Sequence, residues 1–353
     1  MRKISFVVGA RPQFIKHAPV EQAFKRFFDV FTIHTGQHYD EKMSDIFFSE
    51  LNIDKPKYTL QTGGMLHGKQ TALMLEGIEE ILISEKPMGL VVYGDTNSTV
   101  AGAMAAAKLN IPVIHIEAGI RSYNKSMPEE INRVITDHLS SILFAPSNTA
   151  IKCLSYEGIN SSVYNVGDVM YDSLMLAKQR VGNNLTIDEQ ILLTLHRPYN
   201  TDNYDRLYSI LHHINESGKQ VIFPLHPRTR KILTINQFNF EHFNNIEFID
   251  PVSYFELVKL EMTSTIIITD SGGIQKEAYW LRKKCITIRS ETEWPETLLN
   301  GWNTLIFDNL DKLSIVINNP VGEYIPNLFG SSNASIAISE IVHTQLGAEK
   351  LPG

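Results

Sequence analysis

Short apolar runs rich in β-branched residues recur along this chain and alternate with amphipathic stretches of helical length. Strands separated by helices in this way predict parallel sheets with helices on both faces. The predicted strands of the first half are residues 4–8, 30–34, 90–93, 113–116, 142–145 and 163–166. The alternation restarts after Gly182, with predicted strands at 191–195, 221–224, 246–249, 265–269 and 285–288. The pattern therefore predicts an α/β protein with two Rossmann-like, doubly wound parallel-sheet domains.

The length agrees with two domains, because 353 residues exceed the size at which one hydrophobic core keeps growing. The polar stretch at Gly182 is typical of a linker, and the core is expected to change slightly earlier, near Gly167. We expect domains at 1–167 and 168–333, with the amphipathic segment 334–344 packing back on the first. Open parallel sheets bind ligands beyond the carboxyl ends of their strands, so the two domains are predicted to face a cleft.

The composition narrows the class of protein and its partners. Hydrophobic residues make up 43% and charged residues 20% of the chain, as in ordinary globular proteins. A net charge of −7 without a basic stripe argues against nucleic acid as a partner. Cys153 and Cys285 lie far apart and match neither a zinc nor a disulfide pattern, which favours the reducing cytoplasm and no metal. No apolar run approaches the roughly 20 residues needed to cross a bilayer.

The segment Asp270-Ser271-Gly272-Gly273 joins a predicted strand to a predicted helix. The first N–H groups of a helix lack intrahelical acceptors and attract anions, and small residues let a diphosphate approach the main chain. Glu277, one turn further on, could accept hydrogen bonds from ribose hydroxyls. The segment thus predicts a nucleotide diphosphate site, although an ordinary strand-to-helix turn with a Gly-Gly hinge explains it equally well.

Cationic or neutral donors follow three other predicted strands. Arg11 and Lys16 follow the first strand, where a solvated helix start is the simpler explanation when they are taken alone. The pairs His196-Arg197 and His226-Pro227-Arg228 follow two strands of the second half. Because these two pairs recur at strand ends, we expect their side chains to face the diphosphate.

Three carboxylates of the first half lie at the ends of predicted strands or at the start of a predicted helix. Asp95 and Glu117 directly follow predicted strands, and Glu130 lies in the first turn of a predicted helix that opens at Pro128. Asp95 could simply cap a helix, and Glu130 could complement a helix dipole. If the three converge, they form a general acid/base set in which crowding moves at least one pKa toward neutrality.

The helix that opens at Pro128 is expected to bury one apolar stripe, formed by residues 131, 134 and 135. Glu130 and Arg133, three residues apart, share another face.

Cofactor motifs are missing from the sequence. No Gly-x-Gly-x-x-Gly follows a predicted strand, and the glycines at 63–68 have the wrong spacing. No Gly-x-x-x-x-Gly-Lys-Ser/Thr occurs either. Neither a bound nicotinamide nor phosphoryl transfer from ATP is expected.

The motifs, taken in order, resemble the non-hydrolysing UDP-N-acetylglucosamine 2-epimerases over nearly the whole chain. They are Gly-Ala-Arg-Pro at 9–12, Gly-Asp-Thr at 94–96, Glu-Ala-Gly-Ile-Arg at 117–121, Pro-Glu-Glu-Ile-Asn-Arg at 128–133, His-Arg at 196–197 and Asp-Ser-Gly-Gly-Ile-Gln at 270–275. The resemblance implies two Rossmann-like domains of the glycosyltransferase-B type. It also implies a homodimer without a cofactor that serves bacterial surface polysaccharide synthesis.

The resemblance further implies inversion at C2 of a UDP-2-acetamido sugar by anti elimination of UDP, a 2-acetamidoglucal intermediate and re-addition. Because the proton is removed from one face of the sugar and returned to the other, at least two acid/base groups are needed. By motif, Asp95, Glu117 and Glu130 take the acid/base positions, while Arg11, Lys16 and His196 match residues near the diphosphate. His196 is counted with the three carboxylates as a catalytic residue. The residues expected to bind substrate or UDP are Arg11, Lys16, Arg121, Arg133, His226, Arg228, Ser271, Gly272, Gly273 and Glu277.

Two positions depart from the family. Many members have an arginine where this chain has Trp294, and a glutamate where it has Tyr199. Trp294, together with segments 35–40 and 169–172, looks more like the branch that acts on UDP-2,3-diacetamido-2,3-dideoxyglucuronic acid. The substrate stays open between that acid and UDP-N-acetylglucosamine. The segment at Gln37 departs from the pattern of the second, activating UDP-sugar site that some members have.

Two other functions share the expected architecture, namely a UDP-sugar glycosyltransferase and a UDP-sugar sensor without catalysis. The carboxylates of the first domain favour the epimerase, because neither alternative needs an acid/base set there.

Overall fold

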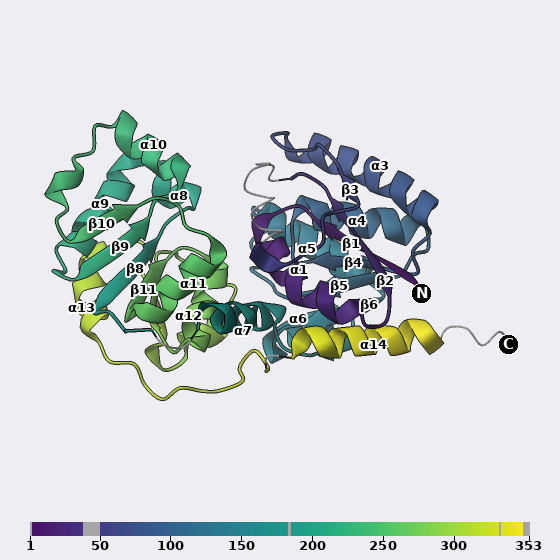
Figure 1. Ribbon diagram of the computed structural model, residues 1–353. Coiled ribbons are helices and arrows are strands. Elements are labelled where there is room, and N and C mark those ends of the chain that lie inside the picture. Colours follow the sequence, from purple (N-terminus) through teal and green to yellow (C-terminus); the bar gives the residue numbers. More distant parts are fainter. Residues whose placement is uncertain (1, 38–49, 183–184, 332, 349–353) are drawn as a thin grey trace. The chain divides into compact units, whose positions relative to one another are not determined.

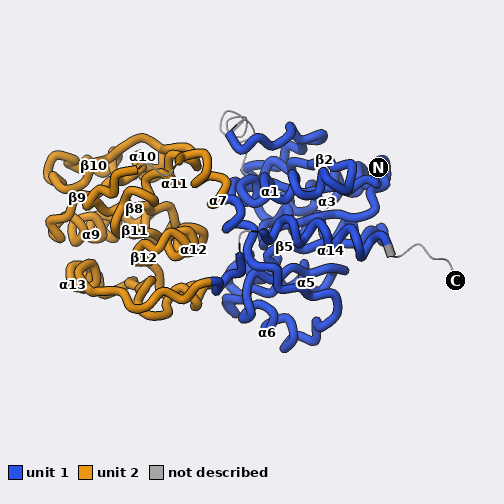
Figure 2. Tube along the Cα trace, turned by 60° about the horizontal axis from the view of Figure 1, so that its bottom comes forward, with its two compact units in different colours: residues 1–173, 327–353 blue, residues 174–326 orange. Residues whose placement is uncertain are grey.

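The computed structural model describes residues 2–37, 50–182, 185–331 and 333–348, which fall into two compact units (Figure 2). Unit 1 comprises residues 1–173 and 327–353, and unit 2 comprises residues 174–326. The first boundary therefore falls inside helix α7 (Val169–Val181) rather than at 167/168. The chain returns to unit 1 at residue 327 rather than at 334.

Unit 1 contains a seven-stranded sheet in the order β3-β2-β1-β4-β5-β6-β7, and every described strand pair is parallel (Figure 1). Its strands are β1 (Lys3–Val8), β2 (Asp29–His34), β3 (Tyr58–Thr59), β4 (Leu90–Tyr93), β5 (Val113–Ile116), β6 (Ile142–Ala145) and β7 (Val163–Asn165). The strand order reverses between β1 and β4, which is the switch point where open α/β sheets bind ligands.

Both faces of this sheet are covered by helices. Ile4, Phe6 and Val8 of β1 pack in one core with α1 (Arg11–Phe24) and α14 (Ala334–Ala348). Val7 points the other way, into a second core with α3 (His67–Glu85) and α4 (Asn97–Lys108). Among the described residues, unit 1 also contains α5 (Pro128–Leu139), beside α4, and α6 (Asn148–Tyr156). Strand residues that alternate between two apolar cores explain why these strands read as uninterrupted apolar runs.

Helix α5 buries a different face from the one predicted. Ile131 is 49% and Ile135 is 38% exposed, so the predicted apolar stripe is wrong. The buried residues of α5 are Glu130, Arg133, Thr136 and Asp137. Charged side chains are buried here because they have partners inside the unit, and such pairing offsets their desolvation.

Unit 2 contains a six-stranded sheet in the order β10-β9-β8-β11-β12-β13, again with all described pairs parallel. Its strands are β8 (Gln190–Thr194), β9 (Gln220–Pro224), β10 (Ile246–Ile249), β11 (Ile266–Thr269), β12 (Lys284–Thr287) and β13 (Asn303–Leu305). Its helices are α8 (Pro198–Thr201), α9 (Tyr204–Asn215), α10 (Pro227–Ile235), α11 (Tyr254–Thr263), α12 (Gly272–Trp280) and α13 (Leu313–Asn318), with short 3-10 turns η1 (Phe240–His242), η2 (Pro295–Gly301) and η3 (Leu310–Lys312). Residues of α9 and α13 pack on one face of the sheet, and residues of α11 and α12 on the other.

The predicted α/β class with two doubly wound parallel sheets is confirmed. Strands β3, with the sequence Tyr-Thr, and β13, with the sequence Asn-Thr-Leu, were not predicted, because neither contains an apolar run. Within the described segments, no helix has both the length and the apolar character that a membrane span requires.

Candidate functional site

Two carboxylates and two cations meet at the switch point of unit 1. The Lys16 ammonium lies 2.6 Å from Oε2 of Glu117, and Nη2 of Arg133 lies 3.5 Å from Oε1 of Glu117. The same Nη2 donates a hydrogen bond to Oδ2 of Asp95. The Asp95 side chain is 30% exposed, whereas that of Glu117 is 7% exposed. The structure therefore brings together four of the predicted site residues, with Asp95 nearest to solvent.

Glu117 adopts a backbone conformation that side-chain-bearing residues rarely take. Its φ angle is +71°, in the left-handed region, immediately after β5. Its N–H donates to the carbonyl of Phe144 at 3.1 Å, and Arg133 donates to its carbonyl oxygen. Gly94 makes room for it, since a Cβ at position 94 would stand 3.2 Å from Oε1 of Glu117. Strained residues held by several contacts cluster at functional sites.

The four side chains balance one another electrostatically. Burial acts to lower the pKa of Arg133, but the charges of Asp95 and Glu117 outweigh it and hold that pKa above its ordinary value. The crowding of carboxylates that the sequence predicted is thus accompanied by cations. A ligand that engages Arg133 would change the environment of both carboxylates at once, and one that engages Lys16 would change that of Glu117.

Glu130 has a different set of partners. Its Oε2 accepts hydrogen bonds from N and Oγ of Ser122 at 2.8 and 3.0 Å, and its Oε1 accepts from N of Tyr123 at 3.1 Å. These contacts hold the loop after β5. The described contacts of Glu130 include none of the cations that join Asp95 to Glu117.

Arg121 is also engaged within unit 1. Its Nε and Nη2 donate to the two carboxylate oxygens of Glu157 at 2.7 and 2.8 Å, and its Nη1 lies 2.7 Å from Oδ2 of Asp137. Burial acts to lower the pKa of Arg121, but these two carboxylates raise it. A guanidinium that is 1% exposed and held on both sides is suited to positioning the loop, and substrate binding by Arg121 stays a prediction.

Gln13 is a supporting residue that sequence reasoning missed. Its Oε1 accepts from the N–H groups of Gly9 and Ala10 at 2.8 and 3.1 Å, and its Nε2 donates to the Tyr93 carbonyl at 3.0 Å. It therefore ties the loop after β1, which leads into Arg11 and α1, to the loop after β4, which carries Asp95. A glutamine five residues after the end of the strand was the available signal.

His115 is a second missed residue. Its Nδ1 lies 2.7 Å from Oδ1 of Asp137, and its Nε2 lies 2.8 Å from the carbonyl oxygen of Gly94. Oδ2 of Asp137 accepts from the N–H of Gly119 at 3.1 Å. Burial acts to raise the pKa of Asp137, but His115 and Arg121 outweigh it and lower that pKa. A histidine inside an apolar strand signalled this network, which supports the backbone beside both Asp95 and Glu117.

In unit 2, Ser271 and the two glycines after it form the start of α12. Ser271 is the N-cap residue, and its Oγ accepts from the N–H of Ile274 at 3.5 Å. Gly272 and Gly273 occupy the first turn, where N–H groups have no acceptor within a helix. The hydroxyl of Ser271 is therefore used in capping, and the main chain of the glycines is what this turn offers to an anion.

Asp270 organises the neighbouring loop after β8. The fully buried carboxylate accepts from N of His196 at 3.1 Å and N of Arg197 at 3.0 Å, and its Oδ1 lies 3.0 Å from Nδ1 of His196. Burial acts to raise the pKa of Asp270, but its hydrogen bond to His196 and the charge of that ring outweigh burial and lower it. The contact orients the imidazole of His196, whose side chain is 46% exposed.

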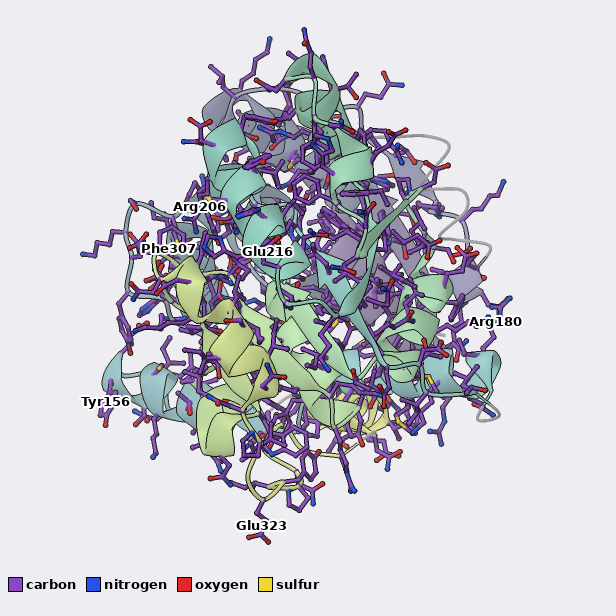
Figure 3. All side chains as sticks on the ribbon, turned by 90° about the vertical axis from the view of Figure 1, so that its left-hand side faces the viewer. Tyr156, Arg180, Arg206, Glu216, Phe307 and Glu323 are labelled. Carbon is purple, nitrogen blue, oxygen red and sulfur yellow. The ribbon has the colours of Figure 1, made fainter. Side chains whose placement is uncertain are left out.

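Two further residues, missed from the sequence, extend this support. Asn200 donates to Oδ2 of Asp270 at 3.1 Å and to the carbonyl of Ile288 at 2.9 Å. Arg206 donates to Oδ1 of Asn200 at 2.9 Å. Arg206 lies against Phe307, with its guanidinium carbon 4.0 Å from the ring centre (Figure 3). The chain of contacts fixes Asp270, and through it His196.

His226 and Arg228 lie at the start of α10. His226 is the N-cap residue and its Nδ1 accepts from the N–H of Arg228 at 3.2 Å. Arg228 forms an ion pair with Asp202 at 2.5 Å, with side chains 54% and 42% exposed. Exposed pairs of this kind are weak. Binding of a diphosphate by His226 and Arg228 stays a prediction.

Glu277 lies in the interior of α12 and is 3% exposed. Its Oε1 accepts a hydrogen bond from the hydroxyl of Tyr254 at 2.9 Å. Glu261 on α11 is a second buried carboxyl group in this region, and burial together with the charge of Glu277 raises its pKa well above the ordinary value. Binding of ribose hydroxyls by Glu277 stays a prediction.

Known proteins resemble the chain over nearly its whole length. The family described as UDP-N-acetylglucosamine 2-epimerase matches residues 22–343. A Methanococcus maripaludis protein named UDP-N-acetylglucosamine 2-epimerase homolog is 49% identical, covering 96% of this chain and 99% of that protein. The Pseudomonas aeruginosa UDP-2,3-diacetamido-2,3-dideoxy-D-glucuronate 2-epimerase is 44% identical, covering 96% and 98%.

A solved structure agrees with these relatives. The Methanocaldococcus jannaschii UDP-GlcNAc 2-epimerase, in complex with UDP-GlcNAc and UDP, matches with a TM-score of 0.87 and 41% identity, covering 97% of this chain and 99% of that one. This match confirms the predicted fold of the glycosyltransferase-B type. The chain belongs to the UDP-N-acetylglucosamine 2-epimerase family and is an isomerase of that type.

Proposed function

We propose that this enzyme inverts C2 of a UDP-2-acetamido sugar without a cofactor, by elimination and re-addition of UDP. The observation that supports it most is the environment of Glu117, which is strained, held against Lys16 and joined to Asp95 through Arg133. A second carboxylate within reach of the same guanidinium is what a reaction on two faces of one carbon needs.

Elimination is favoured because C2 has no neighbouring carbonyl group to acidify its proton. A carboxylate takes the C2 proton, the electrons of the C–H bond form the C1–C2 double bond, and the C1–O bond breaks with its electron pair leaving on UDP. Protonation of C2 from the opposite face, as a phosphate oxygen of UDP bonds to C1 again, gives the epimer. Every proton and electron pair is returned, so no oxidant or reductant is required.

We assign the two acid/base roles to Asp95 and Glu117. Glu130 is given a supporting role, since its carboxylate holds residues 122 and 123. The charge that develops on the leaving diphosphate would be stabilised by Lys16, Arg11 and His196, whose ring Asp270 orients.

UDP binding is assigned to unit 2. The N–H groups of Gly272 and Gly273, reinforced by the α12 dipole, would hold the diphosphate. Glu277 would accept hydrogen bonds from the ribose. His226 and Arg228 are candidates for further diphosphate contacts.

For the sugar, we propose UDP-2,3-diacetamido-2,3-dideoxyglucuronate, with UDP-N-acetylglucosamine as the alternative. Trp294, in place of the arginine of many family members, and the 44% identical P. aeruginosa relative support the first. The 49% identical homolog supports the second. The product would serve synthesis of a surface polysaccharide.

We also propose that the enzyme is a homodimer. Ile131 and Ile135 are exposed one turn apart on α5, and an apolar helix face of this kind is typical of a protein contact.

An NMR experiment in D2O tests the reaction. The purified enzyme is incubated with each UDP-sugar, without acceptor or cofactor, beside a Glu117→Gln control. Deuterium at C2 together with the second epimer is the expected result. A glycosyltransferase would leave C2 protonated without an acceptor, and a sensor would bind the sugar unchanged. Failure of exchange with both sugars would contradict the proposal.

A further inference from the structure

Lys276 is a buried cation inside α12. The residue is only 1% exposed. Its ammonium nitrogen lies 3.6 Å from the centre of the Trp294 ring and 5.9 Å from the centre of the Trp280 ring. Lysine is rarely buried to this extent. Both distances lie within the range of cation–π attraction, and the shorter one places the charge directly on the indole of Trp294.

The same indole reaches the first residue of α12. A Cβ at Gly272 would stand 3.4 Å from Nε1 of Trp294. Gly272 is where we propose that the diphosphate approaches the main chain. One ring therefore touches a buried cation with its face and borders the proposed anion site with its N–H edge.

The loop that carries Trp294 is fixed to α12 by polar contacts. The N–H of Trp294 donates to Oγ1 of Thr292 at 3.1 Å, and that hydroxyl donates to Oε1 of Gln275 on α12 at 2.7 Å. The Trp294 carbonyl accepts from Oγ1 of Thr297 at 2.7 Å. These contacts hold the backbone of Trp294 without using Lys276, whose ammonium faces the ring.

We propose that Lys276 is a positioning residue that holds and polarises the indole of Trp294, so that its N–H serves as a neutral donor to the anionic substrate at the start of α12. The inference rests on the proposed UDP site. A cation on the ring face draws electron density away from the N–H and strengthens it as a donor. Positive potential also remains near a site from which the arginine of many family members is missing.

The test uses the full-length enzyme and compares Lys276→Met, which removes the charge, with Lys276→Arg, which keeps it. Lys259→Met, on the exposed part of α11, is the matched control. UDP affinity is measured by calorimetry, KM and kcat with the sugar that turns over, and folding by thermal melting. Lys276→Met is expected to weaken UDP binding and raise KM about tenfold with a smaller change in kcat, while Lys276→Arg stays within about threefold.

A second test changes the charges at positions 276 and 294 together, so that an effect of charge can be separated from an effect of packing. Trp294→Arg alone would place two cations together and weaken UDP binding, whereas Lys276→Glu combined with Trp294→Arg would form an ion pair and recover affinity. Equal losses in folded Lys276→Met and Lys276→Arg, without recovery in the double variant, would reduce Lys276 to a packing role and overturn the inference. Unchanged UDP affinity in folded Lys276→Met would also overturn it. If the unaltered enzyme did not bind UDP, the proposed function itself would fail, and so would the role proposed here for Lys276 and Trp294.

Discussion

The ammonium nitrogen of Lys16 lies 2.6 Å from Oε2 of Glu117, and both side chains are at most 10% exposed. A diphosphate that attracted Lys16 would compete with this ion pair. Substrate binding and release of the carboxylate for proton transfer would then be coupled through a single lysine.

Glu117→Gln should lower turnover by about 10²- to 10⁴-fold, because the amide cannot take or return the C2 proton. UDP affinity should change only severalfold, since the phosphate ligands are other residues. The two quantities are measured by deuterium exchange at C2 and by calorimetry. A Glu117→Gln enzyme with normal turnover would contradict the assignment.

His115→Leu should destabilise the enzyme by about 3 kcal/mol, because it removes the partner of the buried Asp137 and of the Gly94 carbonyl. Turnover should fall as well, as the loop that carries Asp95 loses its support. Urea unfolding measures the first effect. His138→Leu, on the same unit with a side chain that is 49% exposed, should stay within about 1 kcal/mol. Similar losses in both variants would argue against a special role for His115.

The strands were the part of the fold most accessible from sequence. β4, β5, β6 and β10 begin and end where predicted. β4, β5 and β6 are buried at every position, and strands buried on both faces read as apolar runs. The buried face of α5 could not be predicted from sequence, since a prediction based on hydrophobicity places Ile131 in the core and Arg133 on the surface. Only the tertiary partners of Arg133 reverse that order.

The site was predictable where a residue directly follows a strand, as Asp95 and Glu117 do. Sequence position could not separate a substrate ligand from a side chain that is satisfied within the protein. Arg121 shows the difference, because its partner Glu157 lies 36 residues away and no local pattern points to it. His115 and Asn200 were missed for the same reason.

Glu261 predicts how stability depends on pH. Its pKa is raised well above the ordinary value by burial and by Glu277, and neither of its oxygens has a hydrogen-bond partner among the described residues. The folded protein therefore holds a proton that the unfolded chain releases above about pH 4.5. This carboxyl group makes stability fall by up to about 1.4 kcal/mol per pH unit between its unfolded and folded pKa.

Glu261→Gln should remove that loss, because glutamine resembles the neutral acid. The melting temperature of the Glu261→Gln variant should exceed that of the unaltered enzyme by more at pH 8 than at pH 5. Glu216→Gln, at an exposed position of unit 2, is the control. A difference that did not grow with pH would show that Glu261 is ionised in the folded enzyme.

The exposed face of α5 predicts the effect of a charge on assembly. Ile131→Lys should convert the proposed dimer into a monomer, because a lysine would have to be desolvated in an apolar contact. The fold should persist, since Ile131 is 49% exposed and outside the core of unit 1. Ile315→Lys, at a position on α13 that is 62% exposed, should leave assembly unchanged. Sedimentation velocity at low micromolar concentration measures both variants. An unaltered enzyme that sediments as a monomer, or an Ile131→Lys variant that stays dimeric, would show that this face is not the subunit contact.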